Sequence, residues 1–220
     1  EIVFCDWSSD VCSSDLQVLK NLEIPTVLNI TLMKQNINDF PRIIELIHSI
    51  DIQYRIGLSM TRRNNGDITP LNYFINDKRL VKNVLQHESG NVALDDTNDK
   101  CNQFICEAGV TSICISPDGT VYPCVSLKIP LGSIYKTSIK CLWDSKLRRY
   151  LRDSLRWNKM IECPQCDLLN FCHHCVGISF SEHKNMFCCN QWDRFLSECE
   201  FELGNSTKTH SIEFCSNFHK

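Results

Sequence analysis

The sequence lacks a large excess of charge of either sign. Lys and Arg number 23 against 26 Asp and Glu, so the formal net charge is −3. Nucleic-acid binding draws on a broad basic field, which this balance does not provide. The chain also lacks an apolar run of roughly 18 residues, the length that a membrane span needs. We therefore expect a soluble protein whose partners include neither nucleic acid nor membrane.

A secretory signal, with a basic start and an apolar stretch, is also missing from the sequence. This bears on the fifteen cysteines, because a short secreted chain so rich in cysteine would carry a disulfide framework. Such frameworks belong mostly to chains under about 100 residues, whereas this chain has 220. The missing secretory signal and the length of the chain favour cysteines that bind a metal, with disulfide bonds as the alternative.

What the sequence does contain is an array of eleven cysteines from Cys101 to Cys189. Its two informative blocks read Cys163-Pro-Gln-Cys166 with Cys172-His-His-Cys175, and Cys106 followed by Pro117-Asp-Gly-Thr-Val-Tyr-Pro-Cys124. Thiolates two residues apart converge on one metal or cluster, because a tight turn brings both sulfurs to the same point. The array predicts a metal or cluster site.

The first sixteen residues resemble a translated sequencing-library adapter. The stretch Asp6-Trp-Ser-Ser-Asp-Val-Cys-Ser-Ser-Asp-Leu16 back-translates to the adapter, and Glu1-Ile2 fits the bases that precede it. We expect residues 1–16 to be an artefact outside the fold, with a native serine-rich arm as the alternative. On the adapter interpretation the natural gene begins upstream, the chain is a C-terminal fragment, and no function belongs to Cys5, Trp7 or Cys12.

The segment 17–87 predicts α/β structure. After a helix end, the β-branched runs 26–32 and 52–58 predict strands, and between them Asn38-Asp39 can cap a helix with Pro41 in its first turn. This βαβ pattern implies a parallel sheet. A polar loop over 61–70 follows, where Arg62 and Arg63 could contact a substrate carboxylate or could simply be solvated, and then a short helix over 77–86.

The rest of the chain predicts a second, smaller domain. Residues 88–100 are polar and predict a linker. Short strands are expected over 112–116 and 120–122 around the turn Pro117-Asp-Gly119, with helices over 143–157 and 190–201. The tail 204–220 is polar, and we expect it to be loosely ordered.

The cysteine region resembles the SPASM domain of radical S-adenosylmethionine (SAM) enzymes. Gly119-x4-Cys124 and Cys163-x2-Cys166-x5-Cys172 match the family pattern, and Cys106-Glu-Ala-Gly resembles its Cys-x-Ala-Gly. Leu131-Gly-Ser-Ile134 before Trp143 also resembles a family segment. One departure is that two residues, rather than three, separate Cys172 from Cys175.

The resemblance implies a fold and a set of ligands. Residues 17–87 would be the C-terminal part of a partial (β/α) barrel, and residues 101–203 a cysteine-rich α+β domain with two auxiliary 4Fe-4S clusters. It implies that the first cluster binds Cys101, Cys106, Cys124 and Cys175. The second would bind Cys163, Cys166, Cys172 and either Cys188 or Cys189. In two-cluster ferredoxins, likewise, the last cysteine of a short run serves the neighbouring cluster.

The resemblance also implies an activity. Family members cleave S-adenosylmethionine at a separate cluster held by Cys-x3-Cys-x2-Cys and mostly modify peptides or proteins. No such triplet occurs in this sequence, so that third cluster is expected upstream and the fragment alone is expected to be inactive. The expected partners are a peptide or protein substrate and an electron donor such as flavodoxin or ferredoxin, in a reducing cytoplasm.

Two alternatives concern the same residues. The cysteines could form zinc knuckles in a non-catalytic interaction module, since thiolates alone do not choose between zinc and iron–sulfur, and His173 and His174 could then be ligands. A sulfatase-maturing enzyme is disfavoured because Val125 stands where those relatives carry Asp. Cys114 is expected to be a buried small hydrophobe, and three cysteines without paired spacing are not expected to be ligands: Cys141, Cys199 and Cys215.

Overall fold

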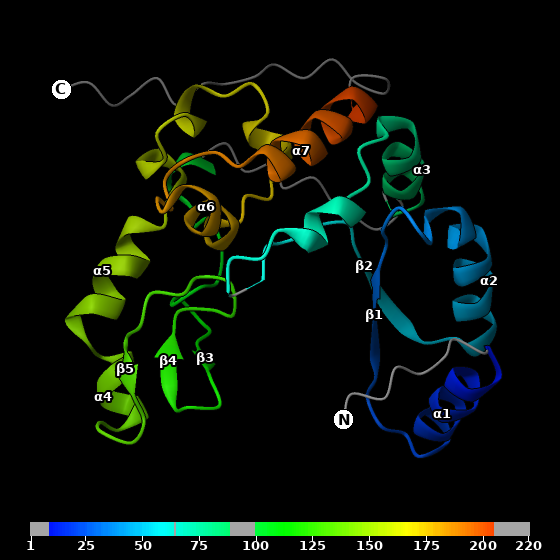
Figure 1. Ribbon diagram of the computed structural model, residues 1–220, viewed down its shortest axis with the longest axis horizontal. Coiled ribbons are helices and arrows are strands. Elements are labelled where there is room, and N and C mark those ends of the chain that lie inside the picture. The colour runs from blue at the N-terminus through cyan, green and yellow to red at the C-terminus, as the bar shows by residue number, and fades with distance from the viewer. Residues whose placement is uncertain (1–8, 64, 89–99, 205–220) are drawn as a thin grey trace.

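The protein is described here from a computed structural model that places residues 9–63, 65–88 and 100–204. The N-terminal elements are helices packed on a small parallel sheet, and the cysteine-rich elements form a second part beside them (Figure 1). Helix α1 (Ser9–Asn21) runs through the expected boundary between residues 16 and 17. Cys5 and Trp7, most of the expected linker and the tail from residue 205 lie outside the described residues.

The expected βαβ unit is confirmed. Strands β1 (Val27–Thr31) and β2 (Gln53–Gly57) pair in parallel, in a register that runs from Val27 opposite Gln53 to Thr31 opposite Gly57. Helix α2 (Phe40–Ile50) connects them. Exposure alternates along both strands, because one face of the sheet packs on the helices while the other stays open. Among the described residues this sheet has two strands, so the partial barrel stays a prediction.

Helix α2 begins where the sequence predicted, but not through the expected cap. Asp39 occupies the N-cap position and Pro41 lies in the first turn, yet the Asp39 side chain makes no capping hydrogen bond. A 3-10 turn, Ile37–Asp39, leads directly into the helix instead. Pro41 suits the first turn, where no backbone N–H is needed.

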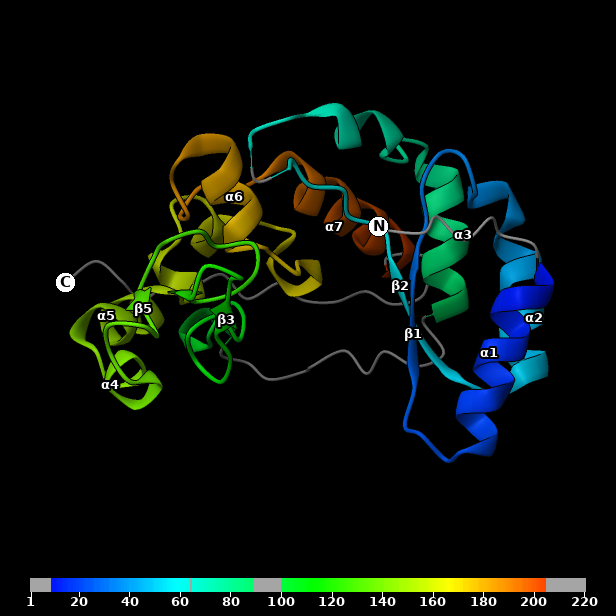
Figure 2. The same cartoon turned by 60° about the horizontal axis from the view of Figure 1, so that its bottom comes forward.

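Helix α7 (Gln191–Gly204) joins the two parts of the molecule. It packs on α3 (Lys78–Glu88), and Figures 1 and 2 show it between α3 and α6 (Val176–His183). Cys199 on α7 is fully buried in the core that β1, β2, α2 and α3 build. The aromatic ring of Phe74 lies 3.8 Å from that of Trp192 and 5.5 Å from that of Phe195, centroid to centroid. The cysteine-rich part thus ends inside the hydrophobic core of the N-terminal part.

The cysteine-rich part contains a three-stranded antiparallel sheet and short helices. Its strands are β3 (Cys114–Ile115), β4 (Thr120–Tyr122) and β5 (Gly132–Ser133), in that order. The prediction of a single helix over residues 143–157 is wrong. The structure has α4 (Ile139–Trp143) and α5 (Lys146–Ser154), because Ser138 and Ser145 each cap a new helix through their side-chain oxygens.

None of the helices placed by the structure combines the length and the apolar composition that crossing a membrane requires.

Candidate iron–sulfur sites

Four of the expected ligands surround one cavity. Its volume is about 510 Å³, and four of the residues that line it are Cys163, Cys166, Cys172 and Cys189. We call these four the second cysteine group. Cys188 is described as well but is not among the residues that line this cavity. The geometry therefore distinguishes two neighbouring cysteines between which the sequence offered no choice.

Consecutive tight turns bring the second cysteine group together. The 3-10 turn Cys163–Gln165 ends with the Cys166 N–H donating to the Cys163 carbonyl at 3.1 Å. A second 3-10 turn, Leu169–Phe171, ends in the same way at Cys172, whose N–H donates to Leu169 at 3.2 Å. Buried Trp157, Met160 and Leu169 pack around Cys163 and Cys172 and exclude water from this side of the cavity.

The thiols of the second cysteine group influence one another. Burial, and then charges that include those of Cys172 and Cys189, raise the pKa of Cys163 to about 12. Burial also raises the pKa of Cys172 to about 11, although the hydroxyl of Ser197 acts in the opposite direction. Such thiols stay protonated in the free protein, and binding of a metal or cluster must displace their protons.

Three further ligands expected from the sequence form a first cysteine group: Cys106, Cys124 and Cys175. Cys106 and Cys124 pack against the same core as Val176, the neighbour of Cys175. Burial raises the pKa of both Cys106 and Cys175, and among the further causes the charge of Cys124 acts on each of them. Cys124 thus lies within electrostatic reach of both Cys106 and Cys175.

Backbone N–H groups point at the sulfurs of the first cysteine group. The Leu127 N–H donates to Cys124 Sγ at 3.2 Å. The Ile178 N–H donates to the Cys175 carbonyl at 3.1 Å. Burial raises the pKa of Cys175, and the backbone N–H groups of Ile178 and Gly177 act in the opposite direction. Burial likewise raises the pKa of Cys106, and the backbone N–H of Ala108 lowers it by a smaller amount. Donors of this kind stabilise thiolates and tune iron–sulfur clusters.

The β3–β4 hairpin holds Cys124 in place. Its turn is the expected Pro117-Asp-Gly119: Gly119 has φ +75°, and Asp118 Oδ1 accepts from the Thr120 N–H at 3.0 Å. A side chain at Gly119 would be strained by this backbone conformation and would also collide with the ring of Tyr135. The glycine of the Gly-x4-Cys pattern is thus required by the turn that leads into Cys124.

Buried Arg148 links the loop after Cys106 to helix α5. Its Nη1 donates to the carbonyl of Gly109 at 2.9 Å, its Nε donates to the carbonyl of Trp143, and its guanidinium lies 4.4 Å from the Trp143 ring centroid. The Cys-x-Ala-Gly and Trp segments, far apart in the sequence, are therefore joined by one arginine. Sequence reasoning missed this residue, because its role depends on the tertiary fold.

Cys101 lies apart from the first cysteine group to which the resemblance assigned it. It packs against the core that contains Cys163 and Cys172. It is also disulfide-bonded, and a cysteine in that state offers no thiolate to a cluster. Its assignment to the first cluster stays a prediction that applies to the reduced chain.

The remaining candidate residues take several positions. Cys199 is buried in an apolar core, Cys141 is exposed and Cys114 is half-buried on β3, while Cys215 lies outside the described residues. His174 is buried, whereas His173 is largely exposed and lies 3.6 Å from Glu200. Arg63 pairs with Asp67 within the polar loop at 3.5 Å, and Arg62 Nε is buried without a hydrogen-bond partner.

Sequence reasoning also missed a set of buried polar residues next to the cysteines: Ser179, Asn190, Asp193 and Ser197. One signal could have found two of them. Asn190 directly follows Cys189, and its Oδ1 accepts from the Asp193 N–H at 2.9 Å, as a helix N-cap does. An Asn followed three residues later by an acid, before a helical run, resembles a capping box.

The two cysteine groups have the donor chemistry of iron–sulfur ligands. The second group offers four thiols around a space much larger than a single ion needs, and the first offers sulfurs that accept backbone N–H groups. Among the residues that the structure places, no group of three or more His, Cys, Asp or Glu side chains that could hold a metal ion is found. The four thiols around the cavity are the type of donor that an iron–sulfur cluster takes.

A family comparison agrees with this class of site. Residues 106–167 match the model of SPASM, an iron-sulfur cluster-binding domain. The matched segment contains Cys106, Cys124, Cys163 and Cys166, and the cavity continues beyond its end with Cys172 and Cys189. This part of the chain is therefore similar to an iron–sulfur cluster-binding domain. No curated protein matches the chain significantly.

Proposed function

We propose that the chain is the auxiliary-cluster portion of a radical SAM enzyme that modifies a peptide or protein. It holds two 4Fe-4S clusters. The first is bound by Cys106, Cys124 and Cys175, with Cys101 as the fourth ligand once its disulfide is reduced, and the second is bound by Cys163, Cys166, Cys172 and Cys189. The observation that carries the proposal is the cavity with four cysteine thiols, which begins inside the SPASM match and extends past it.

The division of the short cysteine run supports two adjacent clusters. Cys163, Cys166 and Cys172 line one cavity, whereas Cys175 does not line it and lies within electrostatic reach of Cys124. A run of thirteen residues thus serves two sites, as in two-cluster ferredoxins, and fixes one cluster relative to the other.

The bound clusters would supply one-electron transfer. The chain's own residues hold the thiolates and control their surroundings. Trp157, Met160 and Leu169 exclude water on one side of the second group, while backbone N–H groups donate to the sulfurs of the first. Low water access and N–H donors are two of the factors that set the potential of a cluster.

The choice of reaction rests on Val125. In sulfatase-maturing relatives an Asp follows the cysteine that closes Gly-x4-Cys, whereas here an apolar side chain, 68% exposed, stands at that place. Val125 offers no carboxylate to act as a base. We therefore propose crosslinking or oxidation of a ribosomally made peptide, with flavodoxin or ferredoxin as the electron donor and the SAM-binding Cys-x3-Cys-x2-Cys in a preceding segment of the polypeptide.

Anaerobic reconstitution of the printed chain with iron and sulfide tests the proposal. We expect about eight iron and about eight sulfide per chain, which two four-iron clusters require, together with broad visible absorbance. Near-stoichiometric zinc without that absorbance would overturn the proposal and leave a zinc-binding interaction module.

A further inference from the structure

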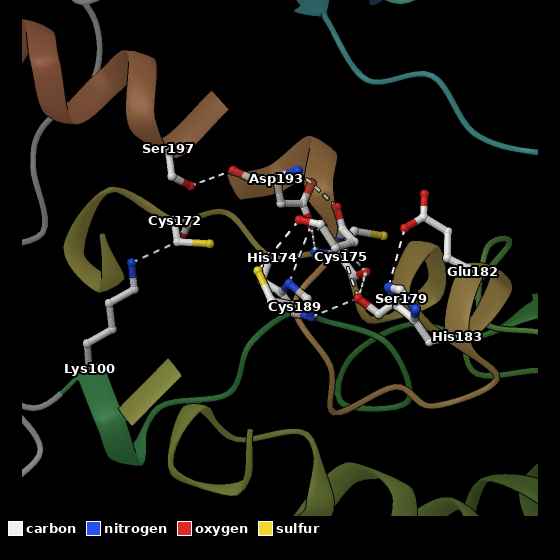
Figure 3. Close-up of polar contacts among 11 residues, drawn as sticks. Lys100, Cys172, His174, Cys175, Ser179, Glu182, His183, Cys189, Asp193 and Ser197 are labelled. Atoms are coloured by element: carbon white, nitrogen blue, oxygen red, sulfur yellow. Dashed lines mark hydrogen bonds and ion pairs between the residues drawn. The ribbon is translucent and has the colours of Figure 1, made fainter. Parts of the chain in front are cut away.

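A buried polar network lies between the two cysteine groups. Each of its side chains belongs to a residue that is at most 5% exposed, and they come from α6, α7 and the segments just before these helices: His174, Ser179, Asn190, Asp193 and Ser197. Asp193 is its acid. Figure 3 shows Asp193 close to Cys175, His174 and Ser197. In this view Cys172 lies to the left of Asp193 and Cys189 lies below it. A buried acid of this kind must be stabilised by its neighbours.

Two of the neighbours of the Asp193 carboxylate donate hydrogen bonds to it. Its Oδ2 accepts from the backbone N–H of Cys175 and from Asn190 Nδ2, the latter at 2.6 Å. The Nδ1 atom of His174 lies 3.5 Å from the same oxygen. An oxygen that accepts two hydrogen bonds and donates none suits the ionised carboxylate. Asp193 therefore places a negative charge in the protein interior.

Asp193 reaches both cysteine groups. It binds the backbone of Cys175 in the first group. On the other side, Ser197 Oγ donates to the Asp193 carbonyl at 2.6 Å and also contacts Cys172. After the effect of burial, the charge of Asp193 is among the causes that raise the pKa of Cys172, Cys175 and Cys189. One carboxylate thus influences ligands from both groups.

We propose that Asp193 is a fixed anion shared by the two clusters and that it lowers the reduction potential of both. The inference rests on the proposed function, since it requires clusters at both cysteine groups. Each cluster gains one electron on reduction, and a nearby negative charge disfavours that gain, more strongly in the interior than in water. No bond forms or breaks in this step.

Lys100 provides a contrast at one group only. Its Nζ donates to the Cys172 carbonyl at 3.1 Å and lies 4.9 Å from the Trp157 ring centroid, beside the second cysteine group. A cation at that place favours the reduced cluster there. Replacement of Lys100 should therefore lower one potential, whereas replacement of Asp193 should raise two.

The variant Asp193→Asn tests the proposal, because it removes the charge while its amide oxygen can keep the contacts that Oδ2 makes. The wild-type chain and the variant are reconstituted anaerobically and titrated with dithionite at controlled potential, with electron paramagnetic resonance as the readout. We expect both midpoint potentials to shift upward in Asp193→Asn. Lys100→Gln should shift the potential of the second cluster downward.

Asp144→Asn is the matched control, since it removes one negative charge from an exposed position at the end of α4. Neither potential should move in this variant. If both clusters form in Asp193→Asn and one or both potentials stay unchanged, the proposal is overturned while the proposed function stands. If the wild-type chain binds no clusters, the proposed function itself fails.

A second variant covers the case in which Asp193→Asn does not fold, as judged by circular dichroism. Asp193→Ser removes the same charge with a smaller side chain, and we expect the same pair of upward shifts. Failure of both variants to fold or to hold iron would show that Asp193 is needed for the structure and would overturn its role in setting the potentials.

Discussion

Cys188 and Cys189 are adjacent in the sequence but face different surroundings. Cys189 lines the cavity with Cys163, Cys166 and Cys172, and the structure places Asn190 directly after it as the cap of α7. Spacing alone could not separate the two cysteines, because a family pattern tolerates a shift of one residue in a loop. Their difference is set by the point at which α7 begins.

The first prediction concerns this pair. Cys189→Ser should abolish the second cluster and so lower the iron content to about half after anaerobic reconstitution, because one of its four thiolates is lost. Cys188→Ser is the matched control and should keep the full iron content. If iron is lost only from Cys188→Ser, the ligand of the second cluster is Cys188 and the assignment of Cys189 is wrong.

Gly177 is a residue at which a single methyl group matters. A Cβ at this position would lie 2.5 Å from Ser126 Cβ and 2.7 Å from the Ser126 carbonyl carbon. Gly177 is in the first turn of α6, next to Cys175, while Ser126 follows Cys124 by two residues. The absence of a side chain at Gly177 lets two ligand-bearing segments approach each other.

We predict that Gly177→Ala destabilises the chain by about 1–3 kcal/mol, as overpacking of a core does, and that it selectively lowers loading of the first cluster. Urea unfolding and the resonance signal of each cluster measure the two effects. Gly57→Ala is the control, because a Cβ there would approach no atom closer than 3.8 Å. A Gly177→Ala chain that loads both clusters normally would contradict the account.

At the scale of elements, local sequence signals such as β-branched runs, helical spacing and turn residues predicted most of the elements. The two parallel strands, α2, α3, the hairpin and α7 are confirmed. Helix α6 was missed: Val176, Gly177, Ile178 and Ser179 are all buried, so its start shows no polar face. The break between α4 and α5 was also missed, although Ser145 carries a recognisable capping signal.

The candidate site was predictable to a similar extent. Cysteine spacing and the family resemblance singled out the candidate ligands and left the choice between Cys188 and Cys189 open, and the structure places four of the candidates around one cavity: Cys163, Cys166, Cys172 and Cys189. Neither could identify Arg148 or Asp193, whose partners are distant in the sequence. Their roles arise only when separate segments pack together.

An ionic cluster joins α3 to α7 and leads to a prediction about pH. Hydrogen bonds from Lys78 and then Lys82 lower the pKa of Glu202 to about 2. Because this pKa is lower than that of a glutamate in the unfolded chain, the stabilisation is fully present above about pH 4.5 and is lost as the pH falls toward about 2. Lys78 pairs with Glu198 as well, at 3.0 Å.

Glu202→Gln should therefore lower the urea midpoint at neutral pH, and the difference from wild type should shrink as the pH falls from about 4.5 toward about 2. Glu45→Gln, at an exposed position on α2, is the control and should show a smaller difference at neutral pH. A Glu202→Gln deficit that is constant over this range would show that the carboxylate charge is not what stabilises the contact of α3 with α7.

At the scale of the whole molecule, the cysteine-rich part and the parallel sheet share helix α7. Its first turn supplies Asp193, which binds the backbone of Cys175, and its later turns bury Phe195 and Cys199 against the sheet unit. One helix thus connects the cysteine sites to the open-faced βαβ unit (Figure 2).

Counting the clusters on the intact chain tests the central claim most directly. After anaerobic reconstitution, native mass spectrometry should find two four-iron clusters on the wild-type chain. The double variants Cys106→Ser/Cys124→Ser and Cys163→Ser/Cys172→Ser should each retain one, because each removes ligands from a different cysteine group. A wild-type chain that carries zinc ions, or double variants that leave the cluster count unchanged, would contradict the account.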